Sequence, residues 1–130
     1  MRSKDSMLRL HRFKAEDKRR QVTEIEFMIS DLQSKVDEFE LQIAHEEKVS
    51  GVSDINHFNY STTAKSIRVR ADNIAQSVIG LNDQLDVAKA DLEEVEAELR
   101  KIELLAQKSG VDIDETPKVV PQVPGIGIRI

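Results

Sequence analysis

The 130-residue sequence contains no cysteine and no tryptophan, and its aromatic residues are limited to four phenylalanines and one tyrosine. Without cysteine the chain has no disulfide, no thiol nucleophile and no cysteine-type zinc site, so nothing indicates an oxidising compartment. No window approaches the ~20 apolar residues that a membrane helix needs, and no apolar run follows the basic N-terminus. We therefore expect a cytoplasmic protein that neither spans a membrane nor carries a secretion signal.

Large side chains that could fill a compact interior are scarce. The chain is 39% hydrophobic and 33% charged, a mixture that favours an elongated structure over a globule. Its net charge of −5 is unevenly distributed, because residues 1–20 hold eight basic and three acidic side chains and the remainder therefore carries −10. This balance argues against general nucleic-acid binding, but it leaves a local basic site near the N-terminus open.

Helix-breaking residues are confined to two parts of the chain. All three prolines follow residue 116, and turn-forming residues cluster at 50–59 around Gly51. We therefore expect a hairpin domain over residues 1–110, with helices at about 5–49 and about 61–109 and a hinge at 50–60. Ser61 can cap the second helix and Gly110 can end it. Residues 111–130 are expected to form a flexible, extended tail.

Apolar residues recur at alternating spacings of three and four in both helices, which is the pattern of a coiled-coil seam. The first seam comprises Val22, Ile25, Ile29, Leu32, Val36, Phe39 and Ile43. Towards the N-terminus it becomes partly polar, through Lys18, Ala15, His11 and Leu8. The second seam runs without a break from Ala64 to Ala106. The sequence thus predicts an all-α fold, a long antiparallel two-helix coiled-coil hairpin that is weakest at its N-terminal end.

The register of the two seams follows from folding the chain back at Ile55. Residues whose numbers sum to 110 then face each other, such as Ile43 and Ile67. In several layers a large side chain opposes a small one, as Phe39 opposes Ala71, which suits packing at a constant helix separation. A shift of seven residues would also keep seam opposite seam, so the periodicity leaves the register open.

Patterns typical of catalysis or metal binding are lacking. The three histidines, His11, His45 and His57, are far apart and form no i, i+4 pair. The chain has no phosphate-binding glycine motif and no nucleophile elbow. The acidic residues are explained as solvated helix faces with basic neighbours. We expect no enzymatic activity, no cofactor and no metal.

Three apolar residues lie at outward positions of the first helix, each two heptads from the next: Phe13, Phe27 and Leu41. Isolated exposed apolar residues are common and need no functional explanation. The alternative is a partner-binding stripe, since a two-helix hairpin has no third layer that would cover these side chains. Both interpretations stay open from the sequence.

A second candidate site is the basic patch. It comprises Arg9, Arg12, Lys18, Arg19 and Arg20. Its expected acidic neighbours on the returning helix are Glu93, Glu94, Glu96 and Glu98. Intramolecular charge pairing therefore competes with docking against an acidic protein surface, and nucleic acid is less favoured because base-stacking aromatic residues are scarce.

The hinge is a third candidate. Its distinctive residues are Gly51, His57, Phe58 and Tyr60. We expect the aromatic side chains to close the end of the coiled coil, with contact to a partner as the less favoured alternative.

Several short segments carry a resemblance to a known family. They are SKDSMLRL at 3–10 with Phe13, KRRQV at 18–22 leading to Ile25 and Glu26, GVSD at 51–54, HFNY at 57–60 and RADN at 70–73. The opening and the hinge are not dictated by the heptads. In these segments, over roughly residues 3–105, the chain resembles the flagellar export protein FliJ family in its alphaproteobacterial form. The tail beyond Gly110 lies outside the resemblance.

The resemblance implies a stalk-like coiled coil that sits in the ring of the flagellar export ATPase and contacts the export gate protein and export chaperones. Such a protein hydrolyses nothing itself and associates peripherally with the inner membrane at the flagellar base. The end formed by both helix termini would enter the ring through the basic patch, and Phe13 and Phe27 would serve the chaperone or the gate. Nucleic acid is not expected.

Two other function classes are consistent with the hairpin. A coiled-coil arm that grips structured RNA would use the same basic patch and would lose affinity steeply with salt. The −10 balance of the remaining chain weighs against it. A prefoldin-like holdase is a further alternative, but the helices of such a protein are joined by paired strands, and this hinge offers no convincing hairpin.

Overall fold

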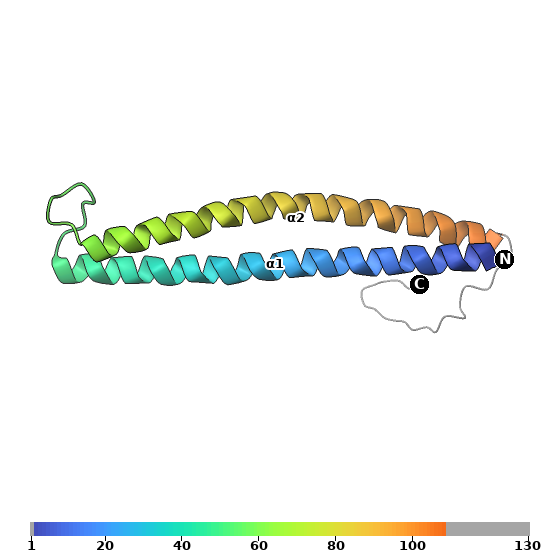
Figure 1. Ribbon diagram of the computed structural model, residues 1–130, viewed down its shortest axis with the longest axis horizontal. Coiled ribbons are helices and arrows are strands. Elements are labelled where there is room, and N and C mark those ends of the chain that lie inside the picture. Colours follow the sequence, from blue (N-terminus) through green and yellow to red (C-terminus); the bar gives the residue numbers. More distant parts are fainter. Residues whose placement is uncertain (1, 109–130) are drawn as a thin grey trace. The chain divides into compact units, whose positions relative to one another are not determined.

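A computed structural model of the protein describes residues 2–108, which form two helices and the loop between them (Figure 1). Helix α1 spans Arg2–Ser50 and helix α2 spans Thr62–Lys108, close to the expected bounds. The prediction of an all-α helical hairpin is confirmed. The expected end of the second helix at Gly110 and the tail at 111–130 lie outside the described residues.

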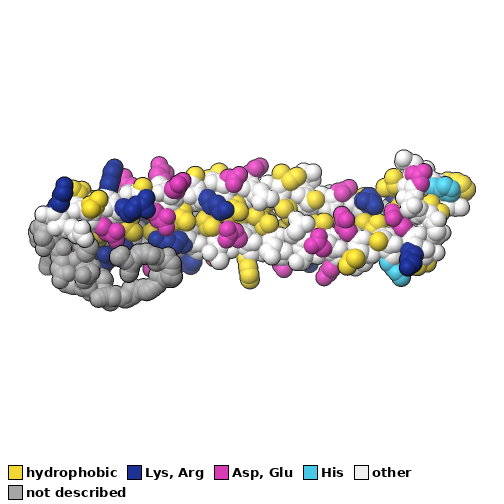
Figure 2. Space-filling model, turned by 180° about the vertical axis from the view of Figure 1, so that it is seen from behind, with side chains coloured by type: hydrophobic (Ala, Val, Ile, Leu, Met, Phe, Trp, Pro, Cys, Tyr) yellow, Lys and Arg dark blue, Asp and Glu magenta, His cyan; other side chains and the backbone are white. Residues whose placement is uncertain are grey.

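The hairpin divides into two units, each built from a segment of α1 and an antiparallel segment of α2 (Figure 1). The terminal unit comprises, among the described residues, 2–19 and 90–108. The hinge unit comprises Arg20–Lys89 and includes the loop. Within each unit, hydrophobic side chains lie between the two helices and charged side chains flank them (Figure 2).

The predicted seam is where the helices meet. Every seam position from Leu8 to Ile43 and from Ala64 to Ala106 is buried or half-buried. In the hinge unit both helices contribute large apolar side chains to it. Ile43, Ala64 and Ile67 form one buried cluster with Tyr60, and Phe39 and Val52 pack against that cluster. Ile43 and Ile67 thus lie together, as the expected register requires.

In the terminal unit the seam is less evenly built. On α1 it consists of Leu8, His11, Ala15 and Lys18, of which Leu8 and Ala15 are buried and the two polar residues are half-buried. On α2 it is apolar throughout, from Leu92 to Ala106. Leu8 is therefore the one large apolar side chain that α1 places in this part of the seam. That this unit is the weaker one stays a prediction.

Ion pairs along one side of the seam establish the register within each unit. They join Arg12 to Glu103 and Arg19 to Glu96 in the terminal unit, and Glu26 to Lys89 and Glu47 to Arg68 in the hinge unit. In all four pairs the residue numbers sum to 115, and both partners occupy e positions of their heptads. These e positions lie beside each other when the facing seam residues have numbers that sum to 110, which is the predicted register. A shift of seven residues would displace the helices by about 10 Å and separate these partners.

The loop is held by local hydrogen bonds. Gly51 ends α1 in the left-handed conformation, with φ of 76°, and its N–H donates to the carbonyl of Glu47 at 2.9 Å. The N–H of Asn56 donates to the Asp54 carboxylate at 3.0 Å. Ser61 caps α2 as predicted, because its hydroxyl oxygen accepts the N–H of Ala64 at 3.1 Å.

Over its described residues, neither helix carries an apolar stretch of the length and hydropathy that crossing a bilayer requires.

Candidate functional site

Three of the five residues of the basic patch are paired with α2 in the terminal unit. Arg19 Nε donates to Glu96 Oε2 at 3.1 Å. Lys18 Nζ lies 3.7 Å from Asp91 Oδ2, and Arg12 Nε lies 3.8 Å from Glu103 Oε2. Because the paired side chains are 30–50% exposed, water and salt screen them and each pair contributes about 0–1 kcal/mol.

The acidic partners are only partly those expected from the sequence. Of the four expected acidic neighbours, Glu96 forms an ion pair with the patch, whereas Glu93, Glu94 and Glu98 form none among the described residues. The heptad explains the difference, since the cross-helix arginine pairs join e positions, whereas Glu93 and Glu94 point outward and Glu98 lies on the other flank of the seam. Lys18, a seam residue, reaches sideways to Asp91.

The other two residues of the basic patch, Arg9 and Arg20, and the nearby Lys14 differ in their interactions. Arg9 and Lys14 are exposed and form no ion pair among the described residues. Arg20 is exposed at the start of the hinge unit and has an intramolecular interaction of its own. Lys14 was not among the residues that the sequence singled out, although its g position beside the seam is typical of an exposed charge.

The terminal unit also exposes apolar side chains. Phe13 is 62% exposed, which confirms its outward position. Met7, Leu10, Leu104 and Leu105 are about half exposed or more, and the sequence interpretation did not single them out. Their heptad positions, none of which lies in the seam, could have identified them.

The hinge unit holds the other two outward residues. Phe27 is 77% exposed and Leu41 is 72% exposed, so neither takes part in the seam. Their predicted outward orientation is confirmed, and the structure places no described side chain over them. Their role in binding stays a prediction.

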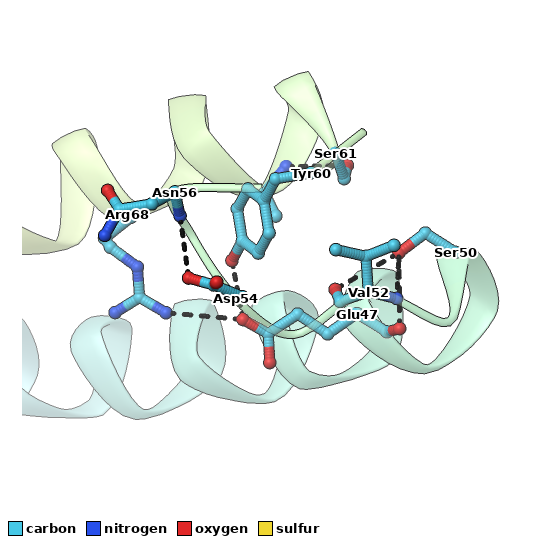
Figure 3. A network of polar contacts seen from close by, with 9 residues as sticks. Glu47, Ser50, Val52, Asp54, Asn56, Tyr60, Ser61 and Arg68 are labelled. Carbon is cyan, nitrogen blue, oxygen red and sulfur yellow. Dashed lines mark hydrogen bonds and ion pairs between the residues drawn. The ribbon is translucent and has the colours of Figure 1, made fainter. Parts of the chain in front are cut away.

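A polar network closes the seam beside the loop. Tyr60 is buried, and its hydroxyl donates to Glu47 Oε2 at 2.6 Å, while Arg68 Nη2 lies 3.7 Å from the same oxygen (Figure 3). The Ser61 hydroxyl donates to Glu46 Oε1 at 3.3 Å. The hydrogen bond to Glu47, and then burial, raises the pKa of Tyr60 above its usual 10.0, since both favour the neutral phenol. This network ties the start of α2 to the end of α1.

The two hinge aromatics have different positions. The prediction that they close the end of the hairpin is confirmed for Tyr60 and wrong for Phe58, which is 89% exposed. Two consecutive turns cause this, because the His57 N–H donates to the Asp54 carbonyl and the Tyr60 N–H donates to the His57 carbonyl. Phe58 therefore lies at the outside of the loop, stacked on His57 with ring centroids 4.8 Å apart.

Within residues 2–108 no group of histidine and carboxylate side chains is arranged to hold a metal ion. His11 lies in the seam, where its Nδ1 donates to the Met7 carbonyl at 2.9 Å. The described residues that could meet another molecule are therefore the charged and apolar side chains on the outer faces of the helices.

Comparison with known proteins yields no relative. No protein-family model, no curated protein and no solved structure matches the chain.

Proposed function

We propose that this protein is a non-enzymatic component of the bacterial flagellar export apparatus, a stalk-like helical hairpin that binds the ring of the export ATPase through its terminal unit. The observation that carries the proposal is the resemblance of the opening segment, 3–10, to the FliJ family. That segment belongs to the same unit as most of the basic patch. A hairpin of two long helices is the form that a stalk of this kind requires.

The charges of the terminal unit suit reversible docking against an acidic surface. Arg9 and Lys14 are exposed cations without an ion pair among the described residues. Arg12, Lys18 and Arg19 face carboxylates in exposed pairs, each worth about 0–1 kcal/mol. An acidic loop of the ring could therefore replace Glu96 as the partner of Arg19 at a small cost in free energy.

In this proposal the export gate protein and export chaperones are further partners. The outward Phe13, Phe27 and Leu41 are the apolar residues available to them. The protein would act on the cytoplasmic side, peripheral to the inner membrane at the flagellar base.

The RNA-binding alternative receives less support. Residues 2–19 carry seven basic and three acidic side chains, but residues 90–108 of the same unit carry three basic and six acidic ones, so its described residues have a net charge of only +1. Carboxylates beside Arg12, Lys18 and Arg19 would repel a phosphate backbone. A nearly neutral unit with complementary charges on its two helices suits a protein partner better than RNA.

The test measures stimulation of the cognate export ATPase by the full-length protein and three variants. Arg9→Glu with Lys14→Glu should reduce stimulation, because it reverses two exposed cations of α1 that form no ion pair among the described residues. Arg19→Glu should reduce it as well, but this change also breaks the pair with Glu96. The swapped variant, Arg19→Glu with Glu96→Arg, restores an intramolecular pair while leaving position 19 negative, and it should remain defective.

The controls lie in the hinge unit. Lys65→Glu with Arg70→Glu reverses two exposed cations of α2 and should leave stimulation unchanged. Full stimulation by the swapped variant would show that Arg19 has only a structural role. If the unmodified protein neither binds nor stimulates the ATPase, the proposed function is wrong.

A further inference from the structure

The outer face of α1 in the hinge unit combines exposed apolar side chains with acidic ones. Phe27 and Leu41 are 77% and 72% exposed and occupy equivalent positions two heptads apart on one helix. At ~1.5 Å per residue they lie about 21 Å apart along α1. On the face drawn in Figure 2, hydrophobic side chains project from α1 between acidic ones.

Carboxylates lie next to both apolar residues. Glu24 and Asp31 lie three residues before and four residues after Phe27. Asp37 and Glu38 precede Leu41 by four and three residues. Residues at these spacings share one helix face, so each apolar side chain has two acidic neighbours.

These carboxylates have no partner among the described residues. Glu24, Asp31, Asp37 and Glu38 are exposed, and none forms an ion pair or a side-chain hydrogen bond there. The acidic residues of α1 that do pair within the unit, Glu26 and Glu47, lie beside the seam. Lys35, which is exposed and likewise forms no ion pair among the described residues, is the one cation between Phe27 and Leu41, so the face keeps a net negative charge.

Two of the outward positions between the apolar residues carry small side chains. They are Ser30 and Ser34, and both are exposed. Small residues at these positions allow another backbone to approach α1 closely between two protruding apolar side chains.

We propose that this outer face binds a basic amphipathic helix of a partner protein. Phe27 and Leu41 insert into the apolar stripe of that helix, and the four carboxylates pair with its lysine and arginine side chains. The spacing of two heptads favours a helix as the partner, because a helix that lies along α1 returns apolar side chains to the contact at the same interval. The proposal does not rest on a role in flagellar export.

The negative charge of this face disfavours three other binding partners: a second copy of the chain, an anionic membrane and a nucleic acid. Residues 20–89 carry seven basic and twelve acidic side chains, a balance of −5. Two copies that met through this face would oppose their carboxylates, and an anionic membrane or a nucleic acid would be repelled. A positively charged helix gains both the apolar contact and the charge complementarity.

The test uses the full chain and a fluorescent synthetic helix of about 21 residues, which is three heptads. The peptide carries leucine at its a and d positions and lysine or arginine at e and g, and binding is measured by fluorescence anisotropy at two salt concentrations. The expected result is saturable binding that a scrambled peptide of equal composition does not reproduce. Phe27→Ser and Leu41→Ser should each weaken it about tenfold.

Charge variants and matched controls separate this site from general attraction. Glu24→Gln with Asp31→Asn should weaken binding about three- to tenfold and reduce its salt dependence. Val69→Ser removes a 59% exposed apolar side chain from α2 of the same unit and should have no effect. Asp83→Asn with Asp86→Asn removes two exposed carboxylates of α2 and should cause at most a twofold loss.

Several results would overturn the proposal. They are absence of binding, equal binding of the scrambled peptide, and affinity that Phe27→Ser and Leu41→Ser leave unchanged. Sedimentation of the unmodified protein tests the remaining occupant, since a dimer that Phe27→Ser converts to a monomer would assign the face to a second copy. The substituted side chains are exposed, so circular dichroism should show unchanged helix content in every variant.

Discussion

The terminal unit and the hinge unit follow the same heptad pattern but fill it with different side chains. In the hinge unit both helices place large apolar residues in the seam, and a hydrogen-bonded loop closes it. In the terminal unit α1 contributes His11 and Lys18 to the seam, and ion pairs flank it. The comparison teaches that periodicity determines where two helices meet, whereas the identity of the seam residues determines how firmly they are held.

The flanking charges differ between the units as well. At the paired e positions of the terminal unit α1 is basic and α2 is acidic. In the hinge unit α1 is acidic and α2 is basic. Since opposite signs meet in both units, the pattern favours this register over a shift that would bring Glu26 opposite Glu96 or Arg19 opposite Lys89.

Truncation of the seam should have the largest effect and should separate the two units. Ile43→Ala removes a 4% exposed side chain from the hinge cluster and should lower the free energy of unfolding by about 2–3 kcal/mol. Leu8→Ala should raise amide exchange chiefly in the terminal unit, because Leu8 is the large apolar residue that α1 contributes there. Chemical denaturation and hydrogen exchange measure the two effects. Equal loss of protection in both units after Leu8→Ala would show a single cooperative unit.

Replacement of Lys18, one of the two polar seam residues of α1, should make the seam of the terminal unit as apolar at this position as that of the hinge unit. Lys18→Leu loses the exposed pair with Asp91 and gains apolar burial, so we expect stabilisation of about 1 kcal/mol. Slower amide exchange near Lys18 and Leu92 would report it. Lys48→Leu, an outward change in the hinge unit, is the control and should give no gain. Destabilisation by Lys18→Leu would show that this seam position requires its charge.

Titration of Tyr60 should destabilise the hinge unit, and not the terminal unit, at alkaline pH. The pKa of Tyr60 is raised above 10.0, first by its hydrogen bond to Glu47 and then by burial. The neutral phenol therefore contributes its full stabilisation of the folded state below pH 10, and this contribution is lost as the pH rises through the folded-state pKa of Tyr60. Tyr60 is the one tyrosine of the chain, so tyrosinate absorbance follows it directly. Tyr60→Phe should lower the melting temperature at neutral pH and reduce its decrease above pH 10. If the melting temperatures of the variant and the unmodified protein decrease in parallel above pH 10, this prediction is contradicted.

The ion pairs should give the smallest effect. A double-mutant cycle of Arg19→Ala and Glu96→Ala should give a coupling of about 0.2–1 kcal/mol at low salt, because both side chains are partly exposed. The coupling should disappear near 1 M salt, where the Debye length is about 3 Å. A coupling that survives high salt would mean that the pair is more shielded than its exposure indicates. Thermal unfolding of the four proteins measures it.

The helices and the seam could be predicted because they depend on periodic residues, whereas periodicity left the register open and the ion pairs establish it. The seam of each helix was identified from its spacing alone, and the pairing of Ile43 with Ile67 follows from the position of the hinge. The outward positions of Phe13, Phe27 and Leu41 follow from the same periodicity.

The candidate sites were less predictable because they depend on how individual side chains extend. The sequence placed acidic residues near the basic patch, and the heptad separates the outward Glu93 and Glu94 from the seam-flanking Asp91 and Glu103. Which flanking carboxylate a long lysine or arginine side chain reaches depends on its rotamer, as the pair of Lys18 with Asp91 shows. The sequence also could not separate Tyr60 from Phe58. Consecutive turns within the loop, not the hydrophobicity of the rings, direct one inward and the other outward.

The hydrogen-bonded loop has a consequence for the order in which the chain folds. Glu47 and Tyr60 are separated by 13 positions in the sequence, whereas Arg19 and Glu96 are separated by 77. Closing the shorter segment costs less chain entropy, so we expect the first contacts between the helices to form at the loop and later ones to extend towards the termini. The basic residues near the N-terminus thus acquire their neighbours last, when nearly the whole described chain has left the ribosome.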